Sequence, residues 1–240
     1  MELIRLNERI WYTTPEEETD RPVLGYIKGD RYALAVDAGN SKAHVQTFYE
    51  LLQLEGLRLP DYTAITHWHW DHTFGMHAVN GVTIAGHKTN EKLKQVMNWK
   101  WTEEAMRARL KSGEDIAFCD ECIRKEYLSR EEIRVKNADI AFKEKLSLDL
   151  GGITCELIGT EAPHSRDSVL IYIPELKVLF TGDADAEDHY EDQGRYDEKL
   201  LRNYIEYLKI VDFDTCIIGH SPVETKASEI AYLEEELAKL

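Results

Sequence analysis

The segment TAITHWHWDHTFG, residues 63–75, places three histidines and an aspartate within six residues: His67, His69, Asp71 and His72. In an extended segment, side chains two residues apart point the same way, so His67 and His69 can bind one ion. Asp71 and His72 follow where the chain turns, and they can reach a second ion nearby. Imidazole and carboxylate groups without a thiolate favour zinc, with iron, manganese or cobalt as other possible occupants.

Three further candidate ligands lie far from this segment in the sequence. His164, Asp183 and His220 each follow a strand-like run. The 63–75 segment also begins at the end of such a run. Strand ends at one edge of a sheet are rigid and close together, which suits a preorganised site. The sequence therefore predicts that these side chains converge on one metal centre.

The order of the predicted elements mixes strands and helices along the whole chain. Strands are expected at 10–14, 22–28, 32–39, 62–66, 81–86, 145–150, 153–159, 168–173, 178–182 and 215–219. Helices are expected at 42–55, 73–79, 195–210 and 223–240, with two or three more between about 88 and 135. We therefore expect one domain, residues 1–240, of the α/β (α+β) class, with a helical insertion at about 88–135.

Composition limits the range of partners. The formal net charge is −16, with 45 acidic and 29 basic residues, and such a surface repels phosphate backbones. No apolar run approaches the length needed to span a bilayer, and the start MELIRLNERIWYTT has no signal-peptide pattern. We expect a cytoplasmic protein that acts on a small molecule, without nucleic-acid or membrane partners.

The four cysteines include one CxxC pair, Cys119 and Cys122. Disulfides are not expected in a cytoplasmic protein. A structural zinc site normally needs two more ligands at comparable spacing, and none follow this pair. We interpret the cysteines as free thiols, with a redox or metal role as the open alternative.

The segment HWHWDH resembles the His-x-His-x-Asp-His signature of the metallo-β-lactamase fold superfamily. AVDAG (35–39) is similar to an early strand of that family that ends in aspartate. PHSRDSVLIYIPELKVLFTGDA (163–184) and IIGHSP (217–222) resemble its later histidine and aspartate segments. The resemblance covers nearly the whole chain. It implies a four-layer αββα sandwich in which two sheets face each other and the site lies at one edge.

The resemblance also implies which residues bind metal, with two zinc ions expected and iron or manganese possible. The first ion would be held by His67, His69 and His164. The second ion would be held by Asp71, His72 and His220. Asp183 would bridge the two ions, and Asp37 would steady the ligand loop without being a ligand itself.

By the same resemblance, a metal-bound hydroxide attacks an ester, thioester, lactone or similar small molecule. Asp71 would lie closest to this nucleophile, orient the water and pass a proton to the leaving group. Two alternatives stay open: a mononuclear iron oxygenase acting on a persulfide, and a phosphodiesterase.

Substrate choice is expected to depend on the segments around the site. Trp68 and Trp70 occupy the spacer positions of the motif, where they either pack beneath the loop or line the substrate pocket. Residues 10–21 are a candidate flap. The 88–135 helices are a candidate lid or a candidate homodimer contact.

Overall fold

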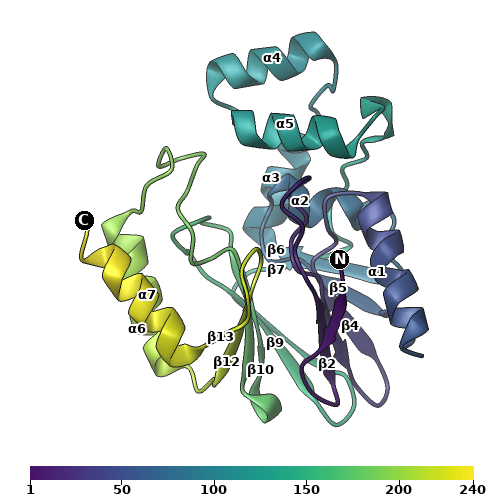
Figure 1. Ribbon diagram of the computed structural model, residues 1–240, viewed down its shortest axis with the longest axis vertical. Helices are drawn as coiled ribbons and strands as arrows, with labels where there is room; N and C mark the ends of the chain where they lie inside the picture. The colour runs from purple at the N-terminus through teal and green to yellow at the C-terminus, as the bar shows by residue number, and fades with distance from the viewer.

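The computed structural model describes residues 1–240 and contains two β-sheets that face each other, with helices on both outer sides (Figure 1). The first sheet has the strand order β1 (Leu3–Arg5), β2 (Ile10–Thr13), β3 (Gly25–Lys28), β4 (Ala33–Val36), β5 (Tyr62–Ala64), β6 (Val82–Gly86) and β7 (Ile140–Phe142). The second has the order β13 (Glu224–Thr225), β12 (Thr215–Ile218), β11 (Val178–Gly182), β10 (Val169–Ile173), β9 (Thr154–Gly159) and β8 (Lys145–Asp149). The predicted αββα sandwich is confirmed.

Alternation along each strand divides its side chains between two apolar layers. In β4, Leu34 and Val36 face the core between the sheets, whereas Ala33 and Ala35 pack under the helix on the outer side. All four are buried, because this strand is covered on both faces. The core between the sheets contains 18 buried residues drawn from both sheets. Burial of apolar surface therefore explains why the two sheets stay together.

Helices close the two outer layers. On the first sheet, α1 (Lys42–Leu54), the 3₁₀ turn η1 (Phe74–His77) and α3 (His87–Val96) bury apolar side chains such as Phe48 and Leu93. On the second sheet, α6 (Glu198–Ile210) and α7 (Lys226–Leu237) lie side by side (Figure 1). Side-chain caps begin three of these helices, because Ser41, Asp197 and Thr225 each accept a hydrogen bond from a first-turn N–H.

The helical segment predicted at about 88–135 divides into two structural parts. Helix α3 packs on the first sheet, so it belongs to the sandwich. Helices α4 (Glu103–Ser112) and α5 (Ala117–Glu126) form a hairpin that projects beyond the sheet edge (Figure 1). A 3₁₀ turn, η2 (Arg130–Glu132), precedes the return to β7. The hairpin therefore stands directly beside the edge where the candidate ligands were expected.

Three strands were not predicted, namely β1, β7 and β13. Each has only two or three residues, too few to show a period-two pattern, and each pairs at the edge of a sheet. The helix predicted at 73–79 is instead a short α-helix, α2 (Trp70–Thr73), followed by η1. No helix combines the length and apolar character needed to cross a membrane.

Candidate metal centre

The seven candidate ligands lie close together at one edge of the sandwich. His67 and His69 lie in the loop after β5, and Asp71 and His72 lie on α2. His164 comes from the β9–β10 connection, whereas Asp183 and His220 follow β11 and β12, which are parallel neighbours. These side chains form two groups, each with its ligand atoms within 4.8 Å of one another: His67, His69 and His164; and Asp71, His72, Asp183 and His220.

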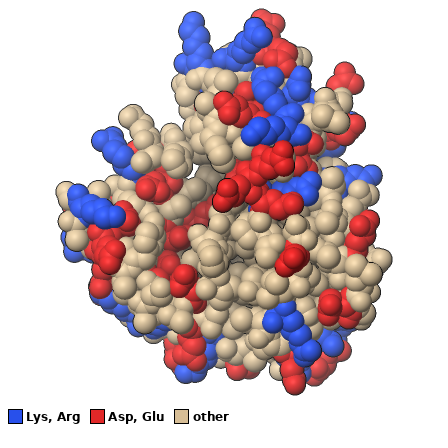
Figure 2. All heavy atoms as spheres, in the orientation of Figure 1, with Lys and Arg blue, Asp and Glu red and all other residues tan.

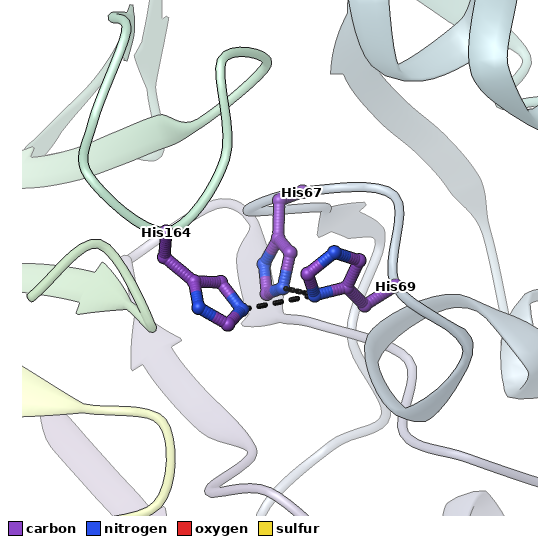
Figure 3. A group of neighbouring side chains, drawn as sticks. All are labelled: His67, His69 and His164. Atoms are coloured by element: carbon purple, nitrogen blue, oxygen red, sulfur yellow. Dashed lines mark hydrogen bonds between the residues drawn. The ribbon is translucent and has the colours of Figure 1, made fainter. Parts of the chain in front are cut away.

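The first group consists of three imidazoles that point toward one another (Figure 3). Nδ1 of His69 lies 3.0 Å from Nε2 of His67 and 2.9 Å from Nε2 of His164. Burial holds the pKa values of His67 and His69 well below the usual range, so both rings are neutral. Nδ1 of His164 lies 2.8 Å from the carbonyl of Glu187, which leaves its Nε2 for the centre. Three imidazole nitrogens that converge in this way suit a cation.

The second group combines two carboxylates with two imidazoles. Nε2 of His72 lies 2.9 Å from Oδ2 of Asp71, and Nε2 of His220 lies 3.0 Å from the same oxygen. Burial alone would lower the pKa of His72, but the carboxylates of Asp71 and Asp183 raise it well above the usual range. Burial likewise opposes protonation of His220, yet Asp183 and Asp71 raise its pKa to about 9. A metal ion would displace these protons, so its binding here is coupled to proton release.

Asp183 lies between the two groups and contacts both. Its Oδ2 is 3.2 Å from Nε2 of His72 and 3.4 Å from Nε2 of His220. The same oxygen is 3.8 Å from Nε2 of His67 and 3.7 Å from Nε2 of His164. Its Oδ1 is buried and has no hydrogen-bond partner. A buried carboxylate oxygen without a donor is costly, and a cation would satisfy it. The donor set and this oxygen therefore fit divalent metal ions.

Residues behind the two groups fix their positions. Asp37 is buried at a left-handed φ of 63°, and its Oδ1 accepts a hydrogen bond of 2.7 Å from the backbone N–H of Thr66. Its Oδ2 lies 2.8 Å from Nδ1 of His72. Asp37 thus contacts the loop that carries the candidate ligands on the side away from the cavity. Gly219 lets the chain pass close to Asp183, because a Cβ at this position would lie 1.9 Å from Oδ1 of Asp183.

A cavity of about 210 Å³ opens over the two groups. Besides the candidate ligands, its wall includes Asp20, Ile116, Phe118, Cys119, Asp185 and Tyr190. Ile116, Phe118 and Cys119 belong to the projecting hairpin and its connecting loop, so the insertion forms part of the cavity wall. Figure 2 shows acidic side chains in the hollow beneath the hairpin.

Trp68 and Trp70, the two candidates for substrate contact, do not line this cavity. Both are buried in an apolar cluster with residues of α4 and α5, including Met106 and Ile123. Trp68 also packs edge-on against the ring of His69, with centroids 4.8 Å apart. Of the two alternatives left open for these tryptophans, packing beneath the loop agrees with the structure.

The sequence patterns did not indicate several residues that line the cavity. Tyr190 packs on the ring of His69 with centroids 4.9 Å apart, and its hydroxyl lies 3.4 Å from both Sγ of Cys119 and Oδ1 of Asp115. Asp20 approaches Nδ1 of His220 to 3.7 Å from the loop expected as a flap. No local pattern marks these residues, because only the fold brings them to the site. All four cysteines are unbonded thiols, as predicted.

Comparison with known proteins identifies the fold. The family description "Metallo-beta-lactamase superfamily" matches residues 24–220. No curated protein matches the sequence. A metallo-beta-lactamase from Pontibacter korlensis is 16% identical, with 100% of this chain and 99% of that chain covered and a TM-score of 0.64. A metallo-beta-lactamase family protein from Thermus thermophilus is 16% identical, with 98% and 80% covered and a TM-score of 0.68.

A third similar structure carries a different activity. It is a stereoselective inverting sec-alkylsulfatase from Pseudomonas sp., which is 18% identical, with 98% of this chain and 41% of that chain covered and a TM-score of 0.72. At these identities the likeness concerns the fold alone. The substrate must therefore be argued from the cavity of this chain.

Proposed function

The chain belongs to the metallo-beta-lactamase superfamily, and on that premise we propose that it is a hydrolase with two metal ions that cleaves a small ester, thioester, lactone or related molecule. The observation that carries the proposal is the pair of ligand groups that share Asp183. We propose zinc as the metal, because the donors are imidazoles and carboxylates without a thiolate. Iron and manganese are the alternatives.

In this proposal His67, His69 and His164 hold one ion, and Asp71, His72 and His220 hold the other. Divalent ions at such a site supply Lewis acidity and make water acidic enough to ionise near neutral pH. Every other contribution comes from the protein. The buried imidazoles of His67 and His69 are kept neutral, and Asp37 orients His72 through its Nδ1.

Asp71 is the proposed proton carrier. Its side chain is buried at the cavity floor. Burial alone would raise the pKa of Asp71, but the positive charge of His72 and His220 keeps it low. A carboxylate in this position orients the attacking water, accepts a proton from it and returns the proton to the leaving group. Asp71 is thus both a ligand and a catalytic residue in the proposal.

The wall of the cavity supports a small, partly apolar substrate. Ile116 and Phe118 from the insertion and Ile218 from β12 supply apolar surface next to the ligand groups. The volume of about 210 Å³ suits part of a small molecule rather than a polymer. No lysine or arginine lines the cavity, which disfavours phosphodiester substrates.

An iron oxygenase with one metal is the second candidate from the sequence. It would use ligands of the His67, His69 and Asp183 type and leave the second metal site unused. The second group is complete, with four side chains whose ligand atoms lie within 4.8 Å of one another. This observation favours two ions, and with them hydrolysis.

A hydrolysis screen tests the proposal. The zinc-loaded protein, the chelated protein and a His69→Ala variant are assayed on thioesters, lactones, carboxylic esters, β-lactams and phosphodiesters. His87→Ala, an exposed histidine outside both groups, is the matched control. We expect hydrolysis of a carboxylic ester, thioester or lactone by wild type and His87→Ala, and its loss after chelation or in His69→Ala. Activity that survives chelation, or oxygen uptake with a persulfide by an iron-loaded protein, would overturn it.

A further inference from the structure

A second cavity of about 440 Å³ adjoins the candidate metal centre on the side of α7. Asp185, Ile218 and Ser221 line both cavities, so the two cavities share part of their walls. This side cavity, as we call it, is also lined by Glu224 and Glu229, and neither lysine nor arginine lines it. Its wall therefore presents three carboxylates, and the imidazole of His220 at the metal centre supplies a positive charge that acts on Asp185.

Two of these carboxylates lack partners although they are buried. Asp185 is 9% exposed and Glu229 is 2% exposed, and neither Oδ1 of Asp185 nor Oε1 of Glu229 has a hydrogen-bond partner. A buried carboxylate oxygen without a donor is unfavourable, and a proton or a cation in this region would satisfy it. Burial, together with Asp185 and Glu224, raises the pKa of Glu229 to about 8. A cation that enters would therefore replace a proton.

The arrangement suits an organic ammonium group better than a metal ion. The side cavity is not among the groups whose ligand atoms gather within 4.8 Å, unlike the two histidine-containing groups. Its wall also includes apolar Ile218 and the half-exposed ring of Tyr232. An ammonium group on an alkyl chain can meet spaced carboxylates, an aromatic ring and an apolar wall at once.

We propose that the side cavity binds the ammonium group of a substrate whose scissile bond lies at the metal centre. The inference rests on the proposed hydrolase function and narrows its substrate class to amine-bearing esters, thioesters or lactones. Asp185 and Glu229 receive the N–H donors, and Tyr232 lies beside the charge. Specificity then comes from the charge at the far end of the substrate.

Binding is tested first, independently of hydrolysis. Butylammonium chloride is titrated into the full-length protein by calorimetry, with 1-butanol, sodium chloride and magnesium chloride as separate comparisons. Glu229→Gln is the test variant, and Glu235→Gln is the matched control, since Glu235 lies on the same helix but is exposed. We expect butylammonium alone to bind, with affinity at least tenfold weaker in Glu229→Gln and unchanged in Glu235→Gln.

Three binding results would overturn the inference. Failure of butylammonium to bind wild type means that the carboxylates only share a proton. Stronger binding of magnesium that is lost in Glu229→Gln means an inorganic ion site. Equal binding by wild type and Glu229→Gln places the ammonium elsewhere. If Glu229→Gln does not fold, Glu224→Gln, at a half-buried position of the same wall, replaces it in the comparison.

Turnover separates this inference from the proposed function. 4-Nitrophenyl 6-aminohexanoate and 4-nitrophenyl heptanoate have chains of equal length and differ in the terminal charge. We expect kcat/KM to favour the amine at least tenfold, and Glu229→Gln to remove this preference while leaving the heptanoate rate unchanged. Equal rates for the two esters in wild type contradict the inference and leave hydrolysis standing. Butylammonium binding without hydrolysis of any ester contradicts the proposed function and leaves the side cavity standing.

Discussion

Oδ2 of Asp37 lies 2.8 Å from Nδ1 of His72, although 35 residues separate them in the sequence. The contact fixes which nitrogen of His72 is available, because Nδ1 faces Asp37 and Nε2 faces Asp71 and Asp183. The backbone of Asp37, which makes this contact, has a left-handed conformation. Such a conformation is unfavourable for most residues but tolerated by aspartate and asparagine.

Replacement of Asp37 by asparagine is expected to weaken metal binding. The amide side chain would keep the backbone conformation but lose the charge that supports His72, and loss of such a partner typically costs about 10–100-fold in affinity. Metal affinity measured by competition with a chromophoric chelator checks this. Asp30→Asn, at an exposed position paired only with Arg9, is the control and should leave affinity unchanged. Wild-type affinity in Asp37→Asn would show that His72 needs no such support.

Replacement of Asp71 by asparagine is expected to lower turnover by about 10²–10⁴-fold, the usual contribution of a positioned proton carrier. The free energy of unfolding should change far less, because the amide has nearly the same size and the apolar core is untouched. Turnover at saturating zinc and denaturation with urea measure the two effects. Metal content must be determined in the same samples. A variant that retains both ions and nearly full turnover would remove the proton role from Asp71.

The ion pair between Arg21 and Glu126 is expected to hold the loop that carries Asp20. Nη2 of Arg21 lies 2.9 Å from Oε1 of Glu126, whose side chain is only 3% exposed and also accepts a hydrogen bond from Ser41. Arg21 would keep its second partner, Glu16, at 3.1 Å, so Glu126→Gln should lower the free energy of unfolding by about 1.5–3 kcal/mol, the usual contribution of a hydrogen bond to a charged group.

Urea denaturation and limited proteolysis near residues 14–21 test this expectation. The exposed pair of Arg9 and Asp30 provides the comparison, since Asp30→Asn should cost less than about 1 kcal/mol. If Glu126→Gln is as stable as Asp30→Asn and the loop is no more readily cleaved, another contact holds the loop.

Glu229 is expected to make stability depend on pH. Its pKa is raised from an ordinary value of 4.5 to about 8 in the folded protein, by burial and by Asp185 and Glu224. Between these values the folded protein holds a proton that the unfolded chain releases, so this contribution is lost as pH rises from about 4.5 to about 8. One proton corresponds to a slope of at most about 1.4 kcal/mol per pH unit.

The difference in the free energy of unfolding between wild type and Glu229→Gln, followed as a function of pH, isolates the contribution of Glu229. Urea denaturation of the chelated proteins at several values between about pH 4 and pH 9, a range that spans both pKa values, should show wild type losing stability relative to the variant as pH rises. Parallel pH profiles for the two proteins would show that Glu229 is ionised in the fold.

The candidate ligands could be selected from the sequence because histidine and aspartate are residue types that bind metal ions. Four ligands crowd into residues 67–72, and the other three follow strand ends, so sequence and sheet geometry together indicate one site. The long strands and the larger helices were predictable for a similar reason, since burial on one or both faces leaves a regular apolar pattern.

Other residues of the cavity wall belong to no recognisable sequence pattern. Asp20, Asp185 and Tyr190 are unremarkable in the sequence, and their chemistry depends on which segments the fold places around the ligands. The role of Trp68 was also decided by tertiary packing, because the α4–α5 hairpin buries it. Strands of two or three residues at sheet edges depend on their partners rather than on their own pattern.

Anomalous X-ray scattering at the zinc edge, from a crystal soaked in zinc, tests the central claim most directly. The account predicts two peaks of comparable height: one bounded by His67, His69 and His164, and one bounded by Asp71, His72 and His220, with Asp183 in contact with both. A single peak in the first group, or zinc bound away from the loop at residues 67–72, would contradict it.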